Sequence, residues 1–177
     1  HCLAMMNADN PKETWVFGPN DIKAGMKMLS EATEIIGHNI ICHDIPALMK
    51  VYPKFSLDGV KITDTLVLSR LIKPDLRDED SARNMSIEDF PRKYHGSHSL
   101  KAWGFRLGTF KGDFGEQTDW SEWTQGMQDY CEQDVVVNYA VWAELASIDF
   151  SERAIEFEHQ MAEICHRIGN AGWHFDV

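Results

Sequence analysis

Residues 34–48, EIIGHNIICHDIPAL, decide the fold prediction because they join a strand to a helix through a short polar turn. The apolar run at 34–39 predicts a strand. Asp44 lies five residues beyond the end of that run and begins a predicted helix. This helix tolerates Pro46 in its first turn and is expected to end at Pro53. A strand–turn–helix unit of this kind is typical of a sheet covered by helices.

The flanking sequence repeats this alternation of strands and helices. Short apolar runs at 1–6 and 14–17 surround the turn signal Asn10-Pro11 and predict a hairpin. Residues 74–96 are predicted as a charged surface loop or a short helical insert, and residues 111–119 as a second loop. The other predicted elements are a helix at 20–32 with Ile22, Met26 and Leu29 on one face, a strand at 60–63, and helices at 65–72 and 99–107, of which Gly108 is expected to end the second. Ser121 is expected to cap a long helix that runs to about residue 146, and a last helix follows at about 151–168. This order predicts an α/β or α+β sheet with helices on its faces.

Composition and charge exclude several classes of protein. The chain has 177 residues, is 44% hydrophobic and carries a net charge of −11. Its length and hydrophobic content predict one folded domain rather than a disordered tail. No apolar run approaches the roughly 20 residues that span a bilayer, and no signal peptide is visible. The negative charge argues against a free-standing, tight nucleic-acid binder, but it suits a site at which carboxylates bind divalent metal.

The cysteines do not form a recognisable metal or redox motif. Cys2, Cys42, Cys131 and Cys165 lack CxxC spacing, and no His/Cys cluster has zinc-site spacing. We therefore predict four free, buried thiols in a reducing compartment.

One face of the predicted long helix is apolar except for a single carboxylate. Met127, Tyr130, Asp134, Val137 and Val141 follow one another at steps of three and four residues. A carboxylate on such a face must be paired, hydrogen-bonded or bound to metal. Tyr130 lies one turn before Asp134, so its hydroxyl can project into the same site. The structural alternative is a salt bridge between Asp134 and a neighbouring arginine.

Three more polar residues stand next to predicted helix starts. Asp44 and Asp64 occupy positions where an N-cap is expected, so capping is the structural alternative for both. His98 precedes the helix at 99–107, and helix N-termini favour anions such as phosphate, although a plain loop histidine is the simpler interpretation. His43 with Asp44 also matches the core of an HD phosphohydrolase, but the other His and Asp positions of that motif are missing.

The order of these residues is more informative than any one of them. Asn39 with Asp44, then Asp64-Thr65, then the Tyr-x-x-x-Asp motif ending at Asp134 resemble the DEDDy branch of the DnaQ-like exonucleases, in which four carboxylates hold two divalent metals. Longer strings resemble the replicative family A DNA polymerases of short-tailed bacteriophages. These strings are HNIICHDIPAL, DTLVLSRLI, GSHSLKAWGFRLG, KG, YCEQDVVV, and EH followed by the ending GWHFD. The resemblance covers almost the whole chain.

The resemblance implies a 3′→5′ proofreading exonuclease with a ribonuclease H-like fold, a mixed α/β sheet of about five strands flanked by helices. It implies that Asp44 and Asp134 are metal ligands and that Tyr130 orients the attacking water or contacts the scissile phosphate. Asn39 would position the terminal nucleotide or brace Asp44, and His98 would contribute to substrate binding. The implied cofactors are two Mg²⁺ ions, for which Mn²⁺ can substitute, and the product is a 5′ mononucleotide.

The same resemblance divides the chain and names its partners. Residues 1–150 would be the exonuclease domain, and residues 151–177 would start the connection to a polymerase portion of the same parent chain. The expected partners are the 3′ end of single-stranded DNA and that polymerase portion, with no membrane. The expected location is the cytoplasm of a phage-infected bacterium.

The sequence departs from the family pattern at the first motif, an Asp-x-Glu on a strand that is central in the family's sheet. No such motif precedes residues 1–6, and Asp21, Glu31 and Glu34 have the wrong spacing. Because the chain begins at His1 rather than Met, we expect either a fragment that omits this strand or a split protein whose second chain completes the sheet. The 177-residue chain alone is expected to bind metal poorly and to show little nuclease activity.

Two alternatives remain at this point. A DEDDy nuclease that trims RNA would share the carboxylate motifs but not the phage-polymerase strings. A degenerate exonuclease-fold module that binds nucleic acid or scaffolds partners without catalysis would explain the absent Asp-x-Glu. The joint presence of Asp44, Tyr130 and Asp134 argues against that module.

Overall fold

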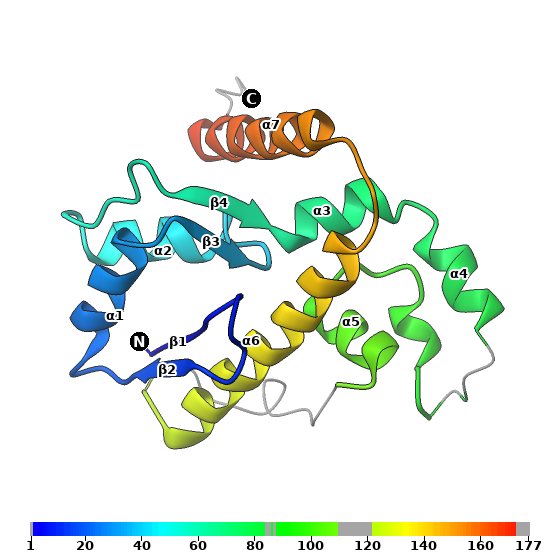
Figure 1. The fold of residues 1–177 in the computed structure, drawn as a ribbon, viewed down its shortest axis with the longest axis horizontal. Coiled ribbons are helices and arrows are strands. Elements are labelled where there is room, and N and C mark those ends of the chain that lie inside the picture. Colours follow the sequence, from blue (N-terminus) through cyan, green and yellow to red (C-terminus); the bar gives the residue numbers. More distant parts are fainter. Residues whose placement is uncertain (1, 84–85, 87, 110–121, 173–177) are drawn as a thin grey trace, which may run out of the picture.

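The computed structural model describes residues 2–83, 86, 88–109 and 122–172, which form a mixed α/β arrangement (Figure 1). The predicted mixture of strands and helices is therefore confirmed. In chain order the elements are β1 (Leu3–Met6), β2 (Thr14–Phe17), α1 (Ile22–Ser30), β3 (Glu34–Gly37), α2 (Asp44–Val51), β4 (Lys61–Asp64), α3 (Thr65–Ile72), α4 (Leu76–Ala82), the 3-10 helix η1 (Arg92–Tyr94), α5 (Leu100–Leu107), α6 (Gln125–Ala146) and α7 (Glu152–Ala171).

The four strands form two separate sheets. β1 and β2 pair antiparallel with Leu3 opposite Phe17, which confirms the predicted hairpin. β3 and β4 pair in parallel with Ile35 opposite Ile62. Within the described ranges no ladder joins β1 to β3, so each of these two strands has a strand partner on one edge only. These residues therefore do not form the single sheet of about five strands that the family resemblance implies.

Helix α6 packs against both sheets and carries the main core (Figure 1). Its buried side chains Met127, Val137, Val141 and Leu145 confirm the predicted apolar face. The core cluster combines Val137, Val141 and Leu145 of α6 with Leu68 of α3, Leu76 of α4 and Trp103 of α5. Burial of each large apolar side chain contributes about 1.5–3 kcal/mol, so this cluster is the main tie between α6 and helices α3 to α5.

Helix α6 begins later than predicted. Its first residue is Gln125, and the Thr124 hydroxyl caps it by accepting the N–H of Met127 at 3.2 Å. Thr124 has the same capping chemistry as the predicted cap, Ser121, and lies directly before the helix. Ser121 itself, the loop predicted at 111–119 and the end of the chain at 173–177 lie outside the described residues.

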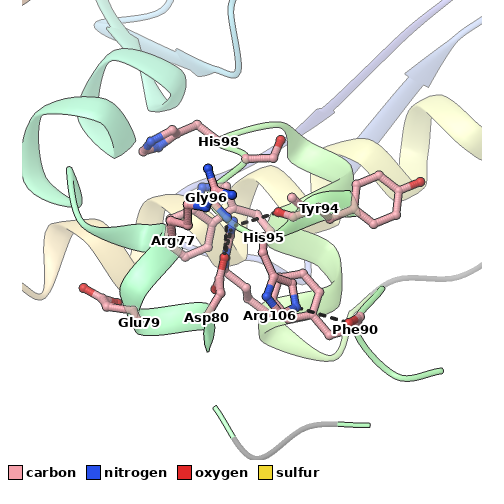
Figure 2. A network of polar contacts seen from close by, with 12 residues as sticks. Arg77, Glu79, Asp80, Phe90, Tyr94, His95, Gly96, His98 and Arg106 are labelled. Atoms are coloured by element: carbon pink, nitrogen blue, oxygen red, sulfur yellow. Dashed lines mark hydrogen bonds and ion pairs between the residues drawn. The ribbon is translucent and has the colours of Figure 1, made fainter. Parts of the chain in front are cut away.

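Residues 74–96 contain the short helical insert that was one of the two predicted alternatives, but not a fully solvated segment. They contain α4 and η1, and the Asp80 carboxylate of α4 is buried. Figure 2 shows this carboxylate accepting hydrogen bonds from the Arg106 guanidinium of α5, at 2.8 and 2.7 Å, and from the N–H of Gly96 at 2.8 Å. The buried ion pair therefore fastens α4 to α5 from within a segment whose charged residues suggested solvent exposure.

The cysteine prediction is correct for bonding and wrong for burial. All four described cysteines are free thiols. Cys42, in the turn before α2, and Cys165, on α7, are exposed, whereas Cys2 and Cys131 are half-buried. Among the described helices, none combines the length and the apolar character that crossing a membrane requires.

Candidate functional site

A buried carboxylate holds the turn between β3 and α2. Asp64, at the end of β4, accepts the N–H of Asn39 at 2.8 Å and the N–H of Ile41 at 3.2 Å. The same side chain caps α3 by accepting the N–H of Leu66 at 2.9 Å, which confirms its predicted capping role. Three backbone hydrogen bonds occupy this carboxylate, so Asp64 supports the turn that carries Asn39 and leads to Asp44.

The turn delivers Asp44 to the first residue of α2. Asn39 adopts a left-handed backbone conformation with φ 60°, which asparagine tolerates better than most residues with a side chain. The chain then reverses, and the N–H of His43 donates to the Asn39 carbonyl at 3.0 Å. The N-cap of α2 is His43, and no side chain makes a capping hydrogen bond there. The capping alternative for Asp44 is therefore wrong, because Asp44 already lies inside the helix.

Asp44 and Asp134 lie close enough for the charge of one to affect the other, although 90 residues of sequence separate them. Burial, and then the negative charge of Asp44, raise the pKa of Asp134 to about 6. Burial also raises the pKa of Asp44, and the charge of Asp64 adds to that effect. A buried carboxylate whose ionisation is disfavoured by a second carboxylate suits a bound divalent cation, which would relieve the repulsion.

Tyr130 shares this site with Asp134. Burial, and then the negative charge of Asp134, raise the pKa of the Tyr130 hydroxyl, while Lys101 acts in the opposite direction. A tyrosine with a raised pKa stays protonated at neutral pH and can donate a hydrogen bond. The structural alternative for Asp134, a salt bridge to an arginine, is not among the ion pairs of the described residues.

His98 has a packing role in addition to the substrate contact predicted for it. Its Nδ1 lies 2.7 Å from the Ser69 hydroxyl, which also accepts the indole N–H of Trp103 at 2.9 Å. Burial, and then Arg106 and Arg70, lower the pKa of His98. A neutral His98 therefore joins α3 to the start of α5, and its contact with substrate stays a prediction.

A polar network that sequence analysis missed joins β3, α3 and α6. The Thr65 hydroxyl is fully buried and lies 2.7 Å from the Asn138 Oδ1 and 2.9 Å from the His38 Nδ1. The Asn138 Nδ2 donates to the Ile36 carbonyl at 3.1 Å. Because an amide oxygen only accepts, the hydroxyl donates to Asn138 and accepts from His38. The sequence feature that could have indicated this network is the position of Asn138, one helical turn after Asp134.

Helix α7 also contacts the supporting residues. The His159 Nε2 accepts the N–H of Asp64 at 2.8 Å, and its Nδ1 donates to the Ile155 carbonyl at 2.7 Å. Both ring nitrogens are therefore committed in the neutral tautomer. Through His159, helix α7 is fastened to the end of β4.

The described residues offer an incomplete metal site. In these ranges no group of three His, Cys, Asp or Glu side chains could hold a metal ion. Mg²⁺ is commonly held by one or two carboxylates, with water and substrate phosphate as the remaining ligands. Asp44 and Asp134 therefore fit one such ion, whereas a full two-metal site needs further carboxylates.

Comparison with known proteins relates the chain to phage polymerases. No protein-family model matches it. It is 34% identical to the DNA-directed DNA polymerase of Escherichia phage T7, over 81% of this chain and 26% of that polymerase. It is 32% identical to the DNA-directed DNA polymerase of Enterobacteria phage T3, over 91% of this chain and 29% of that polymerase. The chain spans less than a third of each relative and is similar to one part of these larger phage DNA polymerases.

Proposed function

We propose that this chain is the 3′→5′ exonuclease portion of a phage DNA polymerase and hydrolyses the 3′-terminal phosphodiester of DNA to release 5′ mononucleotides. The observation that carries the proposal is the pair of carboxylates, Asp44 and Asp134, which distant segments bring together beside Tyr130. Homology to phage DNA polymerases supports a role on DNA. Residues 1–150 would form this ribonuclease H-like unit, and residues 151–177 would lead to the polymerase portion.

Each site residue has a distinct role in this proposal. Asp44 and Asp134 would hold Mg²⁺, or Mn²⁺ in its place. Divalent ions bound there would supply activation of the attacking water and neutralisation of phosphate charge. Tyr130, protonated because its pKa is raised, would donate a hydrogen bond to the scissile phosphate or orient the water. Asn39 would use its side chain toward the terminal nucleotide, because its N–H is committed to Asp64.

A strand carrying Asp-x-Glu, from outside the described residues, would supply the remaining carboxylates. β1 and β3 each have one strand partner, and both strands pack against α6. A strand that paired with both would merge the two sheets into one of five strands and stand beside the helix that carries Asp134. This arrangement also explains why the described residues hold only part of a metal site.

The test is degradation of a 5′-labelled single-stranded oligonucleotide with Mg²⁺ or Mn²⁺. It compares this chain, a version extended upstream through an Asp-x-Glu strand, and Asp134→Ala in the extended version. We expect 3′→5′ degradation by the extended chain, a loss of more than about 100-fold in the variant, and little activity of the 177-residue chain. Hydrolysis by the 177-residue chain at the rate of the extended one would contradict the need for further carboxylates.

A binding module without catalysis is the second candidate. The absence of a group of three potential metal ligands in the described ranges favours it. It predicts that the extended chain binds the oligonucleotide but stays inert in both metals. That result would replace the exonuclease proposal.

A further inference from the structure

The spacing of Asp44 and Asp134 depends on how α6 is fixed against β3. Asp44 follows the turn after β3, whereas Asp134 lies on α6. Apolar packing between these elements is not directional, so by itself it leaves α6 some freedom to slide or rotate. Polar contacts with defined geometry would remove that freedom.

Asn138 provides such contacts one helical turn beyond Asp134. Its Nδ2 donates to the Ile36 carbonyl of β3 at 3.1 Å, and its Oδ1 accepts the Thr65 hydroxyl of α3 at 2.7 Å. The amide is therefore held at both ends by two different elements. Thr65 is fully buried, and its oxygen also lies 3.4 Å from the Gly37 carbonyl at the end of β3.

The residue before Thr65 holds the other half of the site. Asp64 accepts the N–H groups of Asn39 and Ile41 in the turn that leads to Asp44. Asp64-Thr65 thus binds the Asp44 turn through the carboxylate and binds α6 through the hydroxyl. A single stretch of backbone at the β4–α3 junction connects the two candidate metal ligands.

We propose that Asn138, acting through Thr65, is a positioning residue that sets the spacing of Asp44 and Asp134. This inference rests on the proposed function. Residues along a helix are spaced about 1.5 Å apart, and Mg²⁺ demands ligands at about 2.0–2.1 Å in near-ideal octahedral geometry. A slip of α6 by even part of one residue would therefore weaken metal binding at the pair of carboxylates.

The first experiment uses neither metal nor activity. Amide hydrogen exchange at Asn39 and Ile41 is measured in the 177-residue chain and in Asn138→Ala, with Asn170→Ala as a matched control on the exposed end of α7. We expect exchange at the turn to become about tenfold faster in Asn138→Ala and to stay unchanged in the control. Unchanged exchange at the turn in Asn138→Ala would overturn the proposal.

A second pair of variants tests the same link if Asn138→Ala does not fold. Thr65→Val keeps the shape of the side chain and removes the hydroxyl, whereas Thr65→Ser keeps the hydroxyl. A positioning role predicts faster exchange at the turn in Thr65→Val and rescue in Thr65→Ser. Equal behaviour of the two variants would mean that the hydroxyl does not fix the turn.

The extended chain supplies the functional readout. Asn138→Ala should raise the Mg²⁺ concentration for half-maximal hydrolysis by about 10- to 100-fold and leave KM for the oligonucleotide unchanged. A purely structural role would lower the unfolding midpoint and leave the metal requirement of the folded enzyme unchanged, which would refute the proposal. An extended chain that is inert with every residue intact would refute the proposed function alone, because the exchange measurement still decides the positioning role.

Discussion

Removal of Asp80 from its buried ion pair with Arg106 should be among the most destabilising single changes in the chain. Both side chains are fully buried, and Asp80→Ala removes two charge-assisted hydrogen bonds to the guanidinium and one from Gly96 (Figure 2). Arg106 would keep its charge in the interior, and its Nη1 already lacks a hydrogen-bond partner in the described structure. Loss of one member of a buried pair costs about 3–5 kcal/mol, so we expect a loss of that size in the free energy of unfolding.

The assay is urea unfolding at neutral pH, followed by tryptophan fluorescence and circular dichroism. Asp78→Ala is the matched control, because Asp78 is an exposed acid on the same helix. The double variant Asp80→Ala/Arg106→Leu should be more stable than Asp80→Ala alone, because it leaves no uncompensated charge. A cost below about 1 kcal/mol for Asp80→Ala, or a double variant less stable than the single one, would refute this reasoning.

The pH dependence of this ion pair has a defined sign. Burial alone raises the pKa of Asp80, but Arg106 and the Gly96 N–H outweigh burial and lower it. A lowered pKa means that the unfolded chain takes up the proton first, so the stabilisation is complete above the ordinary pKa of 3.8. It should be lost progressively as the pH falls from 3.8 through the lower pKa of the folded state.

Three further changes have predictable outcomes in the same unfolding assay. Gly96→Ala should cost about 1–3 kcal/mol, because Gly96 has φ +74° and a Cβ there would lie 2.9 Å from the Arg77 Cβ; wild-type stability would contradict this. Asp64→Asn should lower the free energy of unfolding by about 1–3 kcal/mol and speed amide exchange at Ile41. The asparagine side chain keeps only one acceptor oxygen, because its amide nitrogen cannot accept a hydrogen bond. An unchanged stability would show that the turn does not depend on the carboxylate. Asp134→Asn should stabilise the chain by about 1–2 kcal/mol at pH 7.5, because a carboxyl whose pKa is raised to about 6 destabilises the fold once it ionises. That gain should fade as the pH drops toward 3.8, and a variant less stable than wild type at pH 7.5 would refute it.

Local signals in the sequence determined most of the elements. The apolar face of α6, the β1–β2 hairpin and the cap provided by Asp64 were all predicted from residues within a few positions of one another, and all are present. Gly108 ends α5 as predicted, with a left-handed φ of +65°. Caps, turns and helical periodicity depend on neighbours along the chain, so a single sequence contains enough information to place them.

The candidate carboxylates were also visible in the sequence, because Asp134 stands on an apolar helical face and Asp44 follows a strand. Their closeness was not visible, since it depends on how α6 packs against β3. The Asp80–Arg106 pair and the Asn138–Thr65 link were missed for the same reason. The sequence does not show whether a charged or amide side chain is exposed or buried. Only long-range packing decides which partner such a side chain contacts. The sequence by itself therefore determined the elements and the candidate residues, and the tertiary structure decided which side chains lie together and which carry the fold.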